Sequence, residues 1–136
     1  MPPEWSADPV HRRLIELRNG LLQLHRALLQ SEKNVYERDI ARINSRFELL
    51  GLIIHDPWFA WLRELSGLVA LIDETLEAKE PAGPEDADRL IAQARALLVP
   101  NETGTGFEKK YFEALQRDPD VVMAHASTLK VIASLT

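Results

Sequence analysis

The sequence contains no cysteine, and this absence excludes disulfide bonds, thiolate catalysis and zinc–thiolate sites. It also has no apolar stretch near the roughly 20 residues that a membrane-spanning helix needs. The first residues, Met1 to Trp5, lack the basic region and following apolar run of a secretion signal. The lack of cysteine does not fix the compartment, but the lack of a secretion signal and of a spanning segment makes a cytoplasmic protein the default prediction.

Positive charge is also scarce, because the formal net charge at pH 7 is −5. After residue 55, fourteen Asp and Glu residues stand against eight Lys and Arg residues. Nucleic-acid backbones and anionic membrane surfaces both favour clustered positive charge on a binding protein. We therefore expect neither nucleic acid nor membrane as a partner.

The composition is that of an ordinary folded domain, with 46% hydrophobic and 27% charged residues in a chain of 136. Apolar residues recur with a helical period, and no segment shows the strand period of two over a useful length. We therefore predict a single all-α domain over residues 1–136. Its architecture is expected to be a helical bundle with a long N-terminal helix, a central apolar helix and several shorter helices.

The longest helical pattern begins at Asp8-Pro9, where Asp suits the N-cap and Pro the first helical position. Apolar residues then repeat at spacings of four and three as far as Leu28, and a second row that starts at Ile15 repeats every seven residues as far as Ile43. This pattern predicts a helix over residues 9–43, and a break at residues 31–34 is left open. Gly20 should cost about 1 kcal/mol relative to Ala, unless a neighbour packs tightly there. The apolar stripe is wide enough to face two neighbouring helices.

Further helix starts are marked by capping residues. Asp-Pro recurs at residues 56–57 and 118–119, and Ser45 with Glu48 has the form of a capping box. The segment after Asp56 is the most apolar in the chain, so we predict that it forms the central helix of the bundle. The helices predicted after the first cover residues 45–54, 57–76, 84–98, 107–116 and 119–132.

A ligand pocket is one hypothesis for the most apolar segment. Trp58 and Trp61 could form its walls, and the planar guanidinium of Arg63 could clamp a carboxylate or phosphate. Tyr111, from a later helix, completes this candidate set. The alternative interpretation is that the aromatic rings belong to the core and that Arg63 pairs with an acid, because an unpaired charge in such a segment is costly.

The histidines give little support to metal binding or catalysis. His11, His25, His55 and His125 include no Glu-x-x-His pattern, which a two-metal helical bundle requires. We therefore predict no metal, no cofactor and no assigned catalytic residue. His25 and His125 lie among apolar neighbours and are interpreted as residues at the bundle boundary. The alternative is a general base that acts beside a carboxylate.

Residues 56–66 have the sequence D-P-W-F-A-W-L-R-E-L-S. This segment resembles one found in a group of small, uncharacterised bacterial proteins. The run from Tyr111 to Val122 is similar to a second stretch of the same group. The resemblance covers about half of the chain and implies an all-helical fold without a known activity. No functional residue is carried over from it.

No set of residues in the sequence demands a particular chemistry. The stripe on the first helix is wider than a chain of this length is expected to cover, and exposed apolar stripes mark interfaces. We therefore predict a non-enzymatic interaction or structural module that binds a second copy of itself or another protein. The alternatives are a bundle that binds a small apolar or anionic molecule, and an enzyme that uses a bundle-lining histidine and a carboxylate.

Overall fold

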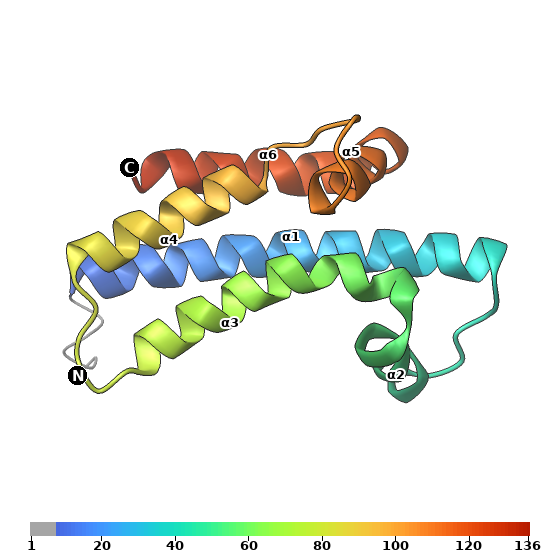
Figure 1. Ribbon diagram of the computed structural model, residues 1–136, viewed down its shortest axis with the longest axis horizontal. Coiled ribbons are helices and arrows are strands. Elements are labelled where there is room, and N and C mark those ends of the chain that lie inside the picture. Colours follow the sequence, from blue (N-terminus) through green and yellow to red (C-terminus); the bar gives the residue numbers. More distant parts are fainter. Residues whose placement is uncertain (1–7) are drawn as a thin grey trace.

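The computed structural model describes residues 8–136, and this part of the chain is helical without any strand. The all-α prediction is therefore confirmed (Figure 1). The elements in chain order are α1 (Pro9–Asp39), α2 (Arg46–His55), the 3₁₀-helix η2 (Pro57–Leu62), α3 (Arg63–Glu77), α4 (Pro84–Leu97), α5 (Phe107–Arg117) and α6 (Pro119–Ser134).

The helix starts follow the capping residues that the sequence predicts. The carboxylates of Asp8, Asp56 and Asp118 each accept a hydrogen bond from the backbone N–H two residues later, at 2.8–2.9 Å. Ser45 Oγ likewise accepts a hydrogen bond from the backbone N–H of Glu48 at 3.0 Å. Each bond satisfies one of the N–H groups that lack a partner in the first turn of a helix. The four predicted caps are confirmed, but the capping box at Ser45 is only half formed, because the Glu48 carboxylate accepts from the backbone N–H of Asn44 at 3.1 Å rather than from that of Ser45.

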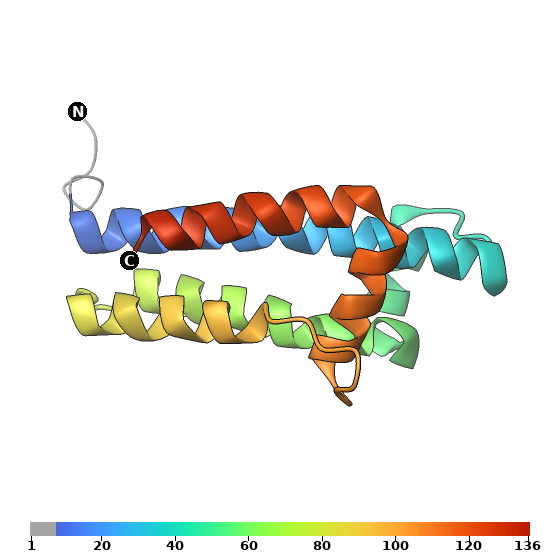
Figure 2. The same cartoon turned by 90° about the horizontal axis from the view of Figure 1, so that it is seen from above.

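The centre of the bundle is occupied by α1, which packs against α3, α4, α5, α6 and η2. Figure 1 shows α1 between α3 on one side and the pair α4 and α6 on the other, and Figure 2 shows α6 alongside α1, whose C-terminal end extends beyond it. The segment 57–76, which was expected to be central, is divided instead into η2 and α3, which ends one residue later at Glu77. Packing on several sides, rather than mean apolarity, decides which helix is central.

The first helix differs from its prediction in two respects. It runs without a break through Ser31, and it ends at Asp39, before the predicted Ile43. Its apolar stripe is covered by the neighbouring helices. Leu22 and Leu29 are partly buried against the core, and five leucines at the centre of the stripe have no exposed surface: Leu14, Leu17, Leu21, Leu24 and Leu28. Surplus apolar width on this helix was the reason for predicting a dimer. That reason is wrong, because the chain itself covers the stripe.

Gly20 lies on the face of α1 that contacts α6. The Thr128 hydroxyl of α6 has one proton, which lies between two carbonyl oxygens: that of Ala124, 2.8 Å from Oγ1, and that of Gly20 on α1, 3.2 Å from Oγ1. A Cβ built at Gly20 would lie 3.7 Å from the nearest atom, in the side chain of Val131. This separation is an ordinary van der Waals contact, so the packing leaves room for a methyl group.

We therefore expect Gly20→Ala to raise the free energy of unfolding by about 0.5–1 kcal/mol, because alanine restricts the unfolded chain and favours the helix. Thermal unfolding followed by circular dichroism should show an increase in Tm of about 2–4 °C. Gly67→Ala in α3, where a Cβ would meet nothing within 4 Å, gives the contribution of helix propensity alone. A lower Tm for Gly20→Ala would mean that α1 and α6 require the glycine.

Candidate functional site

A cavity of about 280 Å³ lies where η2 and α5 meet the second half of α1. Each of the three elements contributes residues that are one helical turn apart and therefore share a face. The lining consists of Glu32 and Val35 from α1, Pro57, Trp58 and Trp61 from η2, and Lys110, Glu113 and Arg117 from α5. The cavity thus combines aromatic walls with charged groups of both signs.

An ion pair between a buried carboxylate and a partly exposed guanidinium joins α5 to α1 at this cavity. Arg117 donates through Nη2 to Glu32 Oε1 at 2.8 Å and through Nε to Ser31 Oγ at 3.2 Å. Ser31 and Glu32 are only 1% and 5% exposed. A carboxylate with so little contact with water needs a cation and hydrogen bonds to be tolerated. Arg117 supplies both and fixes the end of α5 against the helix at the centre of the bundle.

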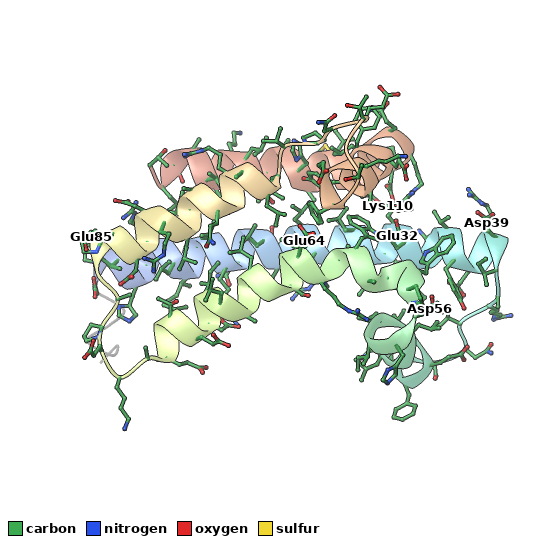
Figure 3. The ribbon with its side chains drawn as sticks, viewed as in Figure 1. Glu32, Asp39, Asp56, Glu64, Glu85 and Lys110 are labelled. Atoms are coloured by element: carbon green, nitrogen blue, oxygen red, sulfur yellow. The ribbon has the colours of Figure 1, made fainter. Side chains whose placement is uncertain are left out.

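Two further charges lie nearer to solvent, on the same face of α5. Lys110 Nζ is 4.0 Å from Glu113 Oε2, and their side chains are 55% and 43% exposed. Figure 3 shows Lys110 of α5 and Glu32 of α1 at the same end of the bundle. The lining therefore carries two cations and two carboxylates. Its formal charge is balanced.

The two tryptophans fix the walls of the cavity through contacts with other rings. Trp58 packs edge-on against Tyr36, with ring centroids 5.8 Å apart, and Trp61 lies 5.3 Å from Phe107. The Nε1 atoms of both indoles are covered by protein and have no hydrogen-bond partner. Within residues 8–136, one other buried side-chain nitrogen shares this property, Arg18 Nε, and it lies 2.5 Å from an Asp73 carboxylate oxygen. The two indole nitrogens have no comparable acceptor beside them.

The structure brings together two of the four predicted ligand-binding residues, Trp58 and Trp61. Arg63 lies apart from them as an exposed residue at the start of α3, where its Nη2 donates to the carbonyl of Ile54 at 2.6 Å. Tyr111 is fully buried, and the ring of Phe107 separates it from Trp61. Neither Arg63 nor Tyr111 lines the cavity.

Sequence reasoning missed Arg117 and Glu32. Arg117 supplies the guanidinium that the ligand hypothesis had assigned to Arg63. The two partners are 85 positions apart in the chain, so no local pattern could pair them. A weaker signal was present in Lys110, Glu113 and Arg117, whose spacing places three charged residues on one face of a short helix.

Tyr111 and His125 form a second polar pair, inside the bundle. The Tyr111 hydroxyl and His125 Nδ1 share a hydrogen bond. Burial lowers the pKa of His125 and raises the pKa of Tyr111, so both side chains favour their neutral forms. Burial also lowers the pKa of His25. The enzyme hypothesis placed a carboxylate beside one of these histidines, whereas the hydrogen-bond partner of His125 is a phenol.

The other feature that points to a function is the surface of α2. None of the residues of this helix is buried, although most of them are apolar. One face, with Leu49, Leu52 and Ile53, packs against the core. The opposite face carries three exposed apolar side chains and a glycine, and we call it the outer face of α2: Phe47 (86% exposed), Leu50 (52%), Gly51 and Ile54 (51%).

This outer face has no cover within the described part of the chain. Figure 1 shows α2 projecting from one end of the bundle, and η2 is its principal neighbour. A Cβ built at Gly51 would meet nothing within 4 Å. A helix that is apolar on all sides normally lies inside a structure. The outer face of α2 therefore has the character of an interface.

Comparison of the chain with protein-family models, with curated proteins and with solved structures finds no match. Within residues 8–136, no helix is long and apolar enough to cross a membrane, and no three His, Asp or Glu side chains are grouped as metal ligands. Two features of the molecule remain as guides to its function. These are the cavity between α1, η2 and α5, and the outer face of α2.

Proposed function

We propose that this protein is a helical interaction module that forms a homodimer through the outer face of α2. The observation that supports the proposal is the exposure of Phe47, Leu50 and Ile54 on a helix whose other face is already packed. Removing apolar surface from water contributes about 25 cal/mol per Å². Binding of a partner to this face therefore stabilises the complex, because it removes from water an apolar surface that the single chain leaves exposed. The cytoplasmic location expected from the sequence belongs to the same proposal.

The shape of the outer face favours a second copy of the chain as the partner. Phe47 projects from the helix, and Gly51 leaves an open space one turn later on the same face. If two α2 helices pack antiparallel about a two-fold axis, each Phe47 can lie over the Gly51 of its partner. A symmetric dimer requires a surface that is complementary to itself. The outer face of α2 meets this requirement, because the Phe47 side chain and the open space at Gly51 lie one helical turn apart.

The charges at the two ends of α2 favour the same arrangement. Arg42 and Arg46 lie before and at the start of the helix, and Asp56 lies at its end. Antiparallel packing brings Arg42 and Arg46 of one chain toward Asp56 of the other, and it likewise brings Glu48 in the first turn toward His55 in the last. It also places the two helix dipoles in opposite directions, which is the favourable orientation for neighbouring helices.

The proposal is tested by Phe47→Glu, with the mass in solution measured by light scattering over a range of protein concentrations. We expect a dimer for the unaltered chain. The substitution should weaken it by at least about 100-fold in Kd, because each dimer contains a central aromatic residue of this kind twice. Met123→Glu on α6, where Met123 is 69% exposed, is the matched control and should leave the dimer intact.

Two results would contradict the proposal. One is a monomeric mass for the unaltered chain at all concentrations up to the millimolar range. The other is equal dissociation by Phe47→Glu and Met123→Glu, which would show that added negative charge, rather than loss of the outer face, separates the subunits. Circular dichroism of both variants confirms that the helices are retained.

A further inference from the structure

We infer that the cavity between α1, η2 and α5 binds a small zwitterion that carries an ammonium and a carboxylate group. This inference is independent of dimer formation, because none of the lining residues belongs to the outer face of α2. The cavity volume of about 280 Å³ lies just below the usual range of roughly 300–1,000 Å³ for ligand sites. The ligand is therefore expected to have the size of a free amino acid.

The balance of charge in the lining indicates a ligand with both signs. A purely anionic ligand would meet the carboxylates of Glu32 and Glu113, and a purely cationic one would meet Lys110 and Arg117. Placing like charges together disfavours binding. A zwitterion offers its carboxylate to Lys110 and its ammonium to Glu113, which are 4.0 Å apart. Arg117 and Glu32 remain paired with each other.

The carboxylate of the ligand has Lys110 as its charged donor. Lys110 lies in the accessible part of the cavity, and its partner Glu113 is 4.0 Å away, beyond a close hydrogen bond. The indole N–H groups of Trp58 and Trp61 are covered by protein, so the two tryptophans contribute apolar wall rather than donors.

The ammonium of the ligand has a complementary environment. Glu113 lies in the accessible part of the cavity, and Glu32 engages Arg117 through Oε1. The faces of the indole rings attract a cation through their π electrons, and tryptophan is the strongest of the aromatic residues in this respect. Acidic oxygens and indole faces together favour an ammonium, including one that carries methyl groups.

The inference is tested by nuclear magnetic resonance of the indole N–H groups in a Trp5→Phe background, so that only Trp58 and Trp61 give indole signals. The probes are free L-amino acids and trimethylglycine, with acetate and tetramethylammonium as the two halves of the latter. We expect at least one zwitterion to shift both signals to saturation. Each isolated half should bind at least tenfold more weakly. No shift with any zwitterion, or equal binding of one half, would overturn the inference.

Two exposed lining residues provide variants that leave the ion pair of Arg117 and Glu32 in place. Lys110→Gln and Glu113→Gln should each weaken zwitterion binding about tenfold, because each removes one charge-assisted contact. Lys109→Gln, at an exposed neighbouring position outside the lining, is the matched control and should bind as the unaltered chain does. Unchanged affinity in both lining variants would overturn the inference. The same titration of Phe47→Glu should give unchanged affinity, which separates this site from the proposed dimer.

Discussion

Replacement of Arg117 by Met is expected to lower the free energy of unfolding by about 3 kcal/mol, as measured by urea denaturation. The change leaves Glu32, which is 5% exposed, without its cation, and it removes the hydrogen bond to Ser31. Loss of one partner of a buried ion pair typically costs about 3–5 kcal/mol. The lower end applies here because the Arg117 side chain is 29% exposed and solvent weakens the interaction.

The loss of stability in Arg117→Met should arise because the buried Glu32 carboxylate is left without a cation, rather than because the contacts of the arginine itself are removed. Glu32→Gln in the Arg117→Met background is therefore expected to recover part of the stability, so that the double variant is more stable than the sum of the single changes predicts. Arg89→Met removes an exposed arginine that pairs with Asp86, and it should change stability little. A loss for Arg117→Met no larger than that for Arg89→Met would show that the ion pair of Arg117 and Glu32 does not hold α5 in place.

The parts of the fold that the sequence predicts depend on neighbours in the chain. A cap forms between residues two or three positions apart, so Asp8-Pro9 and Ser45 identify helix starts without any knowledge of the rest of the molecule. The apolar stripe of α1 is also local, because helical geometry alone places its leucines on one side. These features could be predicted because their physical causes lie within a few residues.

The parts that could not be predicted depend on how the helices meet. The sequence contains both Arg63 and Arg117, and nothing local shows that Arg63 bonds the nearby Ile54 carbonyl while Arg117 reaches a buried carboxylate on α1. The position of the central helix is likewise a property of the assembly. Residues 57–76 are the more apolar segment, yet α1 contacts more of the other helices.

The exposed apolar surface was predicted on α1, whereas the structure has it on α2, and the difference has a physical reason. A wide stripe creates an interface only if the chain lacks enough helices to cover it, and here neighbouring helices on both sides cover α1. The better signal was in residues 46–55, where apolar residues occupy both faces of a short helix. One face of such a helix packs on the bundle, and the other remains outside.

Replacement of Phe59 by Ala is expected to lower the free energy of unfolding by about 3–5 kcal/mol, a large part of the total of a domain of this size. Phe59 has no exposed surface, and its ring lies 5.7 Å from that of Tyr36 on α1. Truncation leaves a cavity where η2 meets α1, and α2 rests mainly on η2. Thermal unfolding followed by circular dichroism should show a decrease in Tm of roughly 10 °C or more.

Phe47→Ala makes the same chemical change twelve positions earlier and is the matched control. Because Phe47 is 86% exposed, its removal should alter the stability of the monomer by less than about 0.5 kcal/mol. Both variants are measured at protein concentrations where the unaltered chain is monomeric, so that self-association does not contribute. Equal losses for the two variants would contradict the packing of η2 against α1. A loss of stability in Phe59→Ala alone would show that Phe59 supports the fold of the monomer. It would also show that Phe47 does not, so that Phe47 is available to contact a partner.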